Sequence, residues 1–77
     1  MEVQVIFFGK LIDITGSPVI SMSEVADTAQ LIQQLQSRFP ELNTYPYLIA
    51  VEKEIVQVNT VLKNKDTVAL LPPYAGG

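Results

Sequence analysis

A single amphipathic helix, predicted over residues 28–39, is the feature that most constrains the fold of this chain. Asp27 is a suitable N-cap residue, and Gln30 three positions later completes a pair that resembles a capping box. Pro40 ends the helix, because proline disfavours helical backbone at the residue before it. The apolar side chains recur at helical spacing and form one stripe that packs on a core: Leu31, Ile32, Leu35 and Phe39.

Short strands are expected on both sides of this helix. They cover residues 2–8, 18–22, 48–51, 55–58 and 67–71, with a short turn or helical loop over 9–16. The 77 residues make one domain, and strands around a single helix indicate the α+β class. We therefore expect residues 1–73 to form a β-grasp (ubiquitin-like) roll, in which a mixed sheet packs on one main helix.

The residue types that are missing restrict the chemistry. The sequence has no cysteine and no histidine, which removes thiolate chemistry, disulfides and the commonest general base and metal ligand. The serines lack an evident activating base, and the eight carboxylates show no spacing typical of a metal site or an acid/base pair. Neither an autonomous enzyme nor a bound metal is therefore expected.

Charge and hydropathy restrict the partners and the location. The net charge is −3, and the five basic residues are scattered along the chain, so nucleic acid and anionic membranes are not expected partners. No apolar run reaches membrane-spanning length, and no signal-peptide pattern is present. The expected location is the cytoplasm.

The last expected strand runs into Pro72-Pro73 and then Tyr74-Ala75-Gly76-Gly77. Two prolines remove two backbone donors, so the sheet cannot continue. Residues 74–77 are expected to form a flexible tail that spans roughly 13–14 Å when extended. Glycines without side chains suit a narrow channel on another protein, and the group delivered is the carboxylate of Gly77. Once activated by a partner, that carboxylate could accept sulfur or be linked to an amine.

Three segments carry a resemblance to a known family: Val3–Gly9 (VQVIFFG), Leu62–Leu71 (LKNKDTVALL) and Pro72–Gly77 (PPYAGG). The chain resembles the small subunit of molybdopterin synthase, the sulfur carrier of molybdenum-cofactor biosynthesis. Two departures stand out, because Lys65 and Glu52 occupy positions where the family usually has glycine and asparagine. Either Lys65 is mildly strained or its turn differs from that of the family.

The resemblance implies a β-grasp carrier that is not itself a catalyst. An E1-like enzyme, which uses ATP, would adenylate Gly77, and the product would be converted to a thiocarboxylate. The tail would enter the large subunit of a heterotetramer, where sulfur passes to a pterin precursor. Gly76 would fit the channel, with a guide formed by Pro72, Pro73, Tyr74 and Ala75. No cofactor bound to this chain is implied.

Strand parity predicts an apolar docking patch at the root of the tail. If Val3, Val5 and Phe7 face the helix, Phe8 points away from it, and the same reasoning places Leu71 and Ile55 outward. In the 55–58 strand, Val56 and Val58 are expected in the core. An exposed patch of Phe8, Ile55 and Leu71 would mark an interface.

Three other functions share these features. A sulfur carrier for thiamine or tRNA thiolation would use the same tail with a different acceptor. A ubiquitin-like modifier would be linked to lysines, and a plain interaction domain would leave the glycines incidental. The mass of the mature terminus and co-purification with a large subunit would distinguish them.

Overall fold

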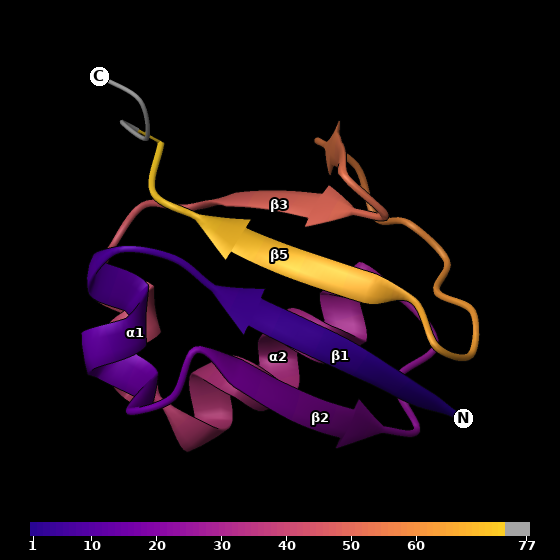
Figure 1. Ribbon diagram of the computed structural model, residues 1–77, viewed down its shortest axis with the longest axis horizontal. Helices are drawn as coiled ribbons and strands as arrows, with labels where there is room; N and C mark the ends of the chain where they lie inside the picture. Colours follow the sequence, from indigo (N-terminus) through magenta and orange to yellow (C-terminus); the bar gives the residue numbers. More distant parts are fainter. Residues whose placement is uncertain (74–77) are drawn as a thin grey trace.

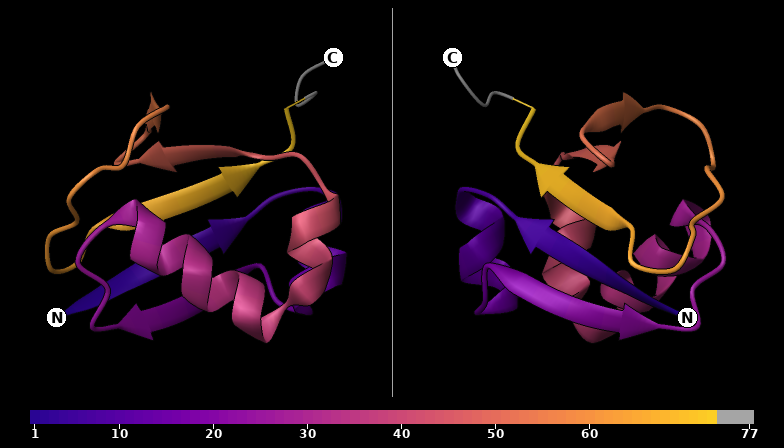
Figure 2. Two further views of the ribbon diagram at one scale, coloured as in Figure 1. Left: turned by 180° about the vertical axis from the view of Figure 1, so that it is seen from behind. Right: turned by 45° about the vertical axis from the view of Figure 1, so that its right-hand side comes forward.

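The computed structural model describes residues 1–73, in which a five-stranded mixed sheet packs over helices on one of its faces (Figures 1 and 2). The strand order is β2-β1-β5-β3-β4, with β1 and β5 parallel and the other neighbours antiparallel. This arrangement confirms the predicted β-grasp roll. In chain order the elements are β1 (Glu2–Phe7), α1 (Lys10–Thr15), β2 (Val19–Ser23), α2 (Thr28–Arg38), the 3₁₀ helix η1 (Pro40–Thr44), β3 (Leu48–Val51), β4 (Glu54–Val56) and β5 (Thr67–Leu71).

Helix α2 begins at the N-cap that the sequence predicts, and the Gln30 side chain bonds back to the residue before that cap. The carboxylate of Asp27 accepts a hydrogen bond from Gln30 N–H at 2.9 Å, and the Gln30 side chain accepts one from Ala26 N–H at 2.8 Å. Asn59 adds a further cap by accepting from Ala29 N–H at 2.9 Å. The orphan donors of the first turn are thereby paired, and the helix ends one residue before Phe39, its C-cap.

The inner face of the sheet closes the core against α2. Val3, Val5 and Phe7 of β1 are buried, as the predicted parity requires. Val68 and Leu70 of β5 are buried beside them, since β1 pairs with β5 in the register Val5↔Val68 and Phe7↔Leu70. The apolar stripe of α2 completes this core through Leu31 and Leu35.

One predicted strand is wrong in its second half. Strand β4 ends at Val56, and the Val58 side chain, expected in the core, is 76% exposed. The chain leaves the sheet here because Thr60 is tied to the start of α2. Its N–H donates to the Thr28 hydroxyl at 3.0 Å, and its carbonyl accepts from Thr28 N–H at 2.9 Å.

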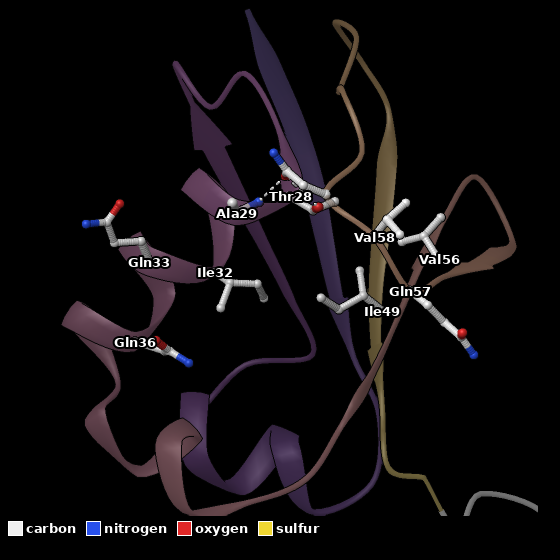
Figure 3. Close-up of a pocket in the computed structure, with 10 residues that line it drawn as sticks. Thr28, Ala29, Ile32, Gln33, Gln36, Ile49, Val56, Gln57 and Val58 are labelled. Carbon is white, nitrogen blue, oxygen red and sulfur yellow. Dashed lines mark hydrogen bonds between the residues drawn. The ribbon is translucent and has the colours of Figure 1, made fainter.

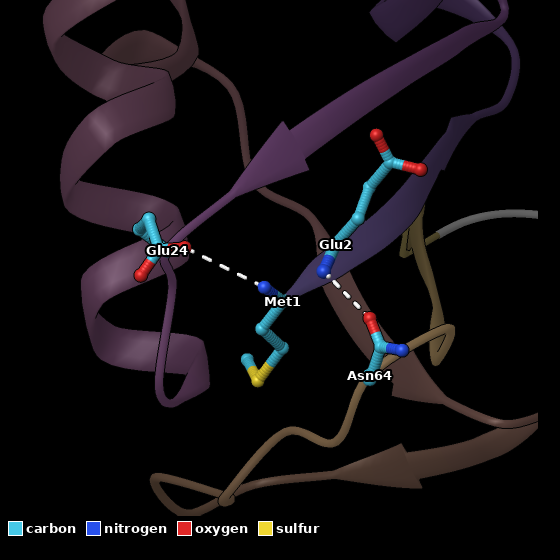
Figure 4. Close-up of polar contacts among 4 residues, drawn as sticks. All are labelled: Met1, Glu2, Glu24 and Asn64. Atoms are coloured by element: carbon cyan, nitrogen blue, oxygen red, sulfur yellow. Dashed lines mark hydrogen bonds and ion pairs between the residues drawn. The ribbon is translucent and has the colours of Figure 1, made fainter.

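The turn before β5 shows how the chain accommodates Lys65. Lys65 has a φ of 71°, in the left-handed region that favours glycine. Of the two predicted alternatives, a strained Lys65 or a different turn, this confirms the mildly strained Lys65. Neighbouring polar groups hold the turn against the start of β1. The Asn64 side chain accepts from Glu2 N–H at 2.8 Å (Figure 4), and Lys65 N–H donates to the Glu2 carbonyl at 2.6 Å.

Candidate functional site

The candidate site begins where β5 leaves the sheet. The last bond between β1 and β5 is donated by Phe8 N–H to the Leu70 carbonyl at 3.2 Å. Pro72 and Pro73 follow Leu71, are half-buried, and offer no N–H to extend the ladder. The predicted residues Tyr74, Ala75, Gly76 and Gly77, and with them the expected flexible tail, lie outside the described residues.

Gly9 shapes the root of this segment and was not assigned a role from the sequence. Its φ of 59° and ψ of −135° lie in a region that is essentially restricted to glycine. A Cβ at this position would approach Pro72 Cγ to 3.0 Å, closer than side chains normally pack. Pro72 can therefore lie against the end of β1 because residue 9 has no side chain. The signal in the sequence was a glycine directly after a predicted strand.

A hollow lies beside the two prolines, and we call it the tail-root hollow. It has a volume of about 370 Å³ and is lined by Lys10, Tyr45, Pro46, Pro72 and Pro73. The rings make most of the wall apolar, and among the described residues that line it Lys10 supplies the one charge. Three distant segments of the chain form it, so sequence reasoning about the last strand alone did not find Lys10, Tyr45 or Pro46.

The outer face of the sheet, opposite α2, continues from this root. Leu71 pairs with Leu48 across β5 and β3, while Ile55 pairs with Ala50 across β4 and β3. All three predicted patch residues share this face, because Phe8 continues the outward parity of Ile6. The exposed fractions are 44% for Phe8, 51% for Ile55 and 39% for Leu48.

These side chains form two adjoining apolar rows across the strands. The row nearer the root contains Phe8, Leu71 and Leu48, and the next contains Val19, Ile6, Ala69, Ala50 and Ile55. Ile55 lies in the second row, next to Ala50. It therefore adjoins Phe8 and Leu71 across the two rows and does not share a row with them. The face is therefore broader than the three predicted residues, and Leu48 and Val19 are exposed members that sequence reasoning missed.

A second groove separates α2 from β4 and the residues that follow it (Figure 3). Its volume is about 430 Å³, with Ile32, Ile49 and Val58 among the apolar side chains and Gln33, Gln36 and Gln57 among the amides. Within the part of the chain that the structure describes, no ionisable side chain lines it. It offers neither a nucleophile with a base nor a pair of acids, so it has no features of a catalytic site.

Metal and membrane features are also absent from the described part of the chain. Within residues 1–73, no three acidic side chains come together in a way that could hold a metal ion. None of the helices described there is both long and apolar enough to cross a membrane.

The fold and the site together define a β-grasp domain whose exposed apolar face adjoins the root of a Gly-Gly segment. The ThiS family profile matches residues 5–77. Two curated relatives are both described as the molybdopterin synthase sulfur carrier subunit. The one from Mycobacterium tuberculosis (strain ATCC 25618 / H37Rv) is 32% identical over 82 residues, covering 100% of this chain and 99% of that protein. The human one is 32% identical over 83 residues, covering 99% and 94%. This chain therefore belongs to the ThiS family, which confirms the resemblance to sulfur carriers.

Two solved structures share the fold of this chain. A chain in the complex of subunits 1 and 2 of the molybdopterin-converting factor from Helicobacter pylori 26695 is 30% identical, with a TM-score of 0.76 and complete coverage of both chains. The small archaeal modifier protein 1 from Methanosarcina acetivorans has a TM-score of 0.82, covering 99% of this chain and 96% of that one. At 22% identity, the second likeness concerns the fold alone.

Proposed function

We propose that this chain is the sulfur-carrier subunit of a molybdopterin synthase. It would carry sulfur as a thiocarboxylate on Gly77 and donate it to a pterin precursor in the large subunit. The observation that carries the proposal is the match to sulfur carrier subunits along the full length of the chain, including the Gly76-Gly77 segment. The outer apolar face beside Pro72 supports it, since such a face suits docking on a large partner.

The chemistry divides between this chain and its partners. An E1-like partner would use ATP to convert the Gly77 carboxylate to an acyl adenylate, with release of pyrophosphate. A sulfur donor would then displace AMP and leave a thiocarboxylate. This chain would supply the carboxylate and its delivery, without catalysing the steps or binding a cofactor, and the proposed location is the cytoplasm, where ATP is available.

Intact-mass analysis of the chain from its native host tests the proposal. We expect a mass gain of one sulfur-for-oxygen exchange located on Gly77. Deletion of Gly76-Gly77 should remove that gain and stop molybdenum-cofactor production, while Val58→Ser serves as a folded control with an intact terminus. An unmodified terminus during active cofactor synthesis, with unchanged cofactor output after the deletion, would contradict the proposal. An isopeptide remnant of the chain on other proteins would instead identify a protein modifier.

A further inference from the structure

The two ends of the outer face differ in their charged groups, which are mixed in sign at the end where β1 begins. At the end where β1 begins, Glu2 shares the outward parity of Ile6, and Glu52 lies beside Thr67, whose N–H donates to the Glu52 carboxylate at 2.6 Å. At the other end, the described residues that line the tail-root hollow include the Lys10 ammonium and no carboxylate. The two apolar rows lie between these ends, and Lys10 stands at the end from which residues 74–77 continue.

Lys10 is the basic residue at the tail-root end of the outer face. Arg38 lies at the end of α2, Lys53 lies in the turn between β3 and β4, and Lys63 and Lys65 flank the turn beside Glu2. Within residues 1–73, the ion pair of the structure joins the Met1 ammonium and Glu24 (Figure 4), and none involves Lys10. The ammonium at the rim of the hollow is therefore available to an acidic group from outside the described residues.

The hollow combines this charge with an apolar wall. Tyr45, Pro46, Pro72 and Pro73 expose rings to solvent around a volume of about 370 Å³, which is room for a large side chain. Filling an apolar pocket with one anchor side chain is how interfaces obtain much of their affinity. A carboxylate beside that anchor would meet Lys10 as water is excluded, which strengthens a charge-assisted hydrogen bond.

We propose that the tail-root hollow anchors a segment of the large subunit in which a bulky apolar side chain adjoins an acidic one. The acidic group pairs with Lys10 at the rim of the hollow, beside the apolar rows. The inference rests on the proposed function, because it assigns the occupant to the partner that would receive residues 74–77.

Binding of the full-length chain to the purified large subunit, measured by calorimetry, tests the charge. Lys10→Glu should weaken binding about tenfold or more, because the attraction becomes repulsion. The variant should remain folded, since Lys10 is exposed and an acidic residue suits the first turn of α1. Lys10→Arg should restore binding, and Lys63→Glu, the same change at the far end, should leave the affinity within about twofold of wild type.

Carbodiimide coupling of the wild-type complex identifies the partner group directly, since it joins amines to carboxylates in contact. We expect mass spectrometry to find Lys10 joined to an aspartate or glutamate of the large subunit, with Lys63 uncoupled. Unchanged affinity of Lys10→Glu, or coupling through Lys63 without Lys10, would overturn the inference and leave the proposed function intact. A wild-type chain that does not bind the large subunit at all would overturn both.

Discussion

At the end where β1 begins, hydrogen bonds with a polar turn hold the strand, whereas at the end where β1 finishes the chain is held by packing. Asn64 and Lys65 hold Glu2 through two hydrogen bonds at 2.8 and 2.6 Å. At the other end, Pro72 lies over Gly9, and Phe8 remains 44% exposed beside it. Both ends depart from ordinary backbone, with a φ of 71° at Lys65 and 59° at Gly9.

The difference shows that folding stability alone can account for the side chains at the start of β1 and cannot account for those at the tail end. The backbone groups of Glu2 at the β1 start are paired, and the exposed side chains of Glu2, Asn64 and Lys65 are charged or amide groups, with the 44% exposed Met1 as an apolar neighbour. The tail end instead exposes apolar side chains that a small monomer would be expected to cover. We therefore expect substitutions at the start of β1 to change stability, and substitutions at the tail end to change binding.

The largest expected effect is on docking through Phe8. Phe8→Ser should weaken binding to the large subunit at least about 30-fold, because a central aromatic anchor commonly contributes about 2 kcal/mol or more. Its unfolding free energy should change by less than about 1 kcal/mol, since the side chain is already half in solvent. Calorimetry with the large subunit and urea unfolding of the free chain give the two values.

Val58→Ser is the matched control for Phe8→Ser, because Val58 is 76% exposed and lines the groove beside α2 instead of the outer face. It should bind like wild type. Equal loss of affinity in both variants would show that docking does not distinguish the outer face from the rest of the surface.

The next effect concerns how Gly9 supports Pro72. Gly9→Ala should lower the unfolding free energy by about 1–2 kcal/mol, because the backbone is strained for alanine and its Cβ meets Pro72. Gly16→Ala should cost about 0.5 kcal/mol, since Gly16 has ordinary left-handed backbone and nothing within 4 Å of an added Cβ. Similar losses in urea unfolding of the two variants would mean that the contact with Pro72 adds nothing.

Local patterns predicted much of the fold. Alternation identified the inner faces of β1 and β5, because burial on one side of a strand leaves a period of two in the sequence. The capping pair of Asp27 and Gln30 and the stop at Pro40 identified α2. Helix α1 was expected as no more than a turn or helical loop, because six apolar-rich residues between glycines do not show a helical period.

The parts that escaped prediction depend on contacts between distant segments. The exposure of Val58 follows from the bonds between Thr60 and Thr28, 32 positions apart. The tail-root hollow needs Lys10, Tyr45 and Pro72 to meet, and no local pattern links them. Phe8, Ile55 and Leu71 were placed on one face by parity, whereas Leu48 required the register between β3 and β5.

The smallest expected effect tests whether the contacts at the start of β1 hold Lys65 in a left-handed backbone conformation that lysine disfavours. Lys65→Gly should raise the unfolding free energy by about 0.5 kcal/mol, because relief of the left-handed backbone exceeds the entropy that glycine adds to the unfolded chain. The bond from residue 65 N–H to the Glu2 carbonyl involves no side chain and should persist. Lys63→Gly is the control, and it should lower stability by about 0.5–1 kcal/mol, since Lys63 is not among the residues with positive φ. Equal losses in urea unfolding would show that this turn relaxes without strain in solution, and the contrast between the two ends would then depend on Gly9 alone.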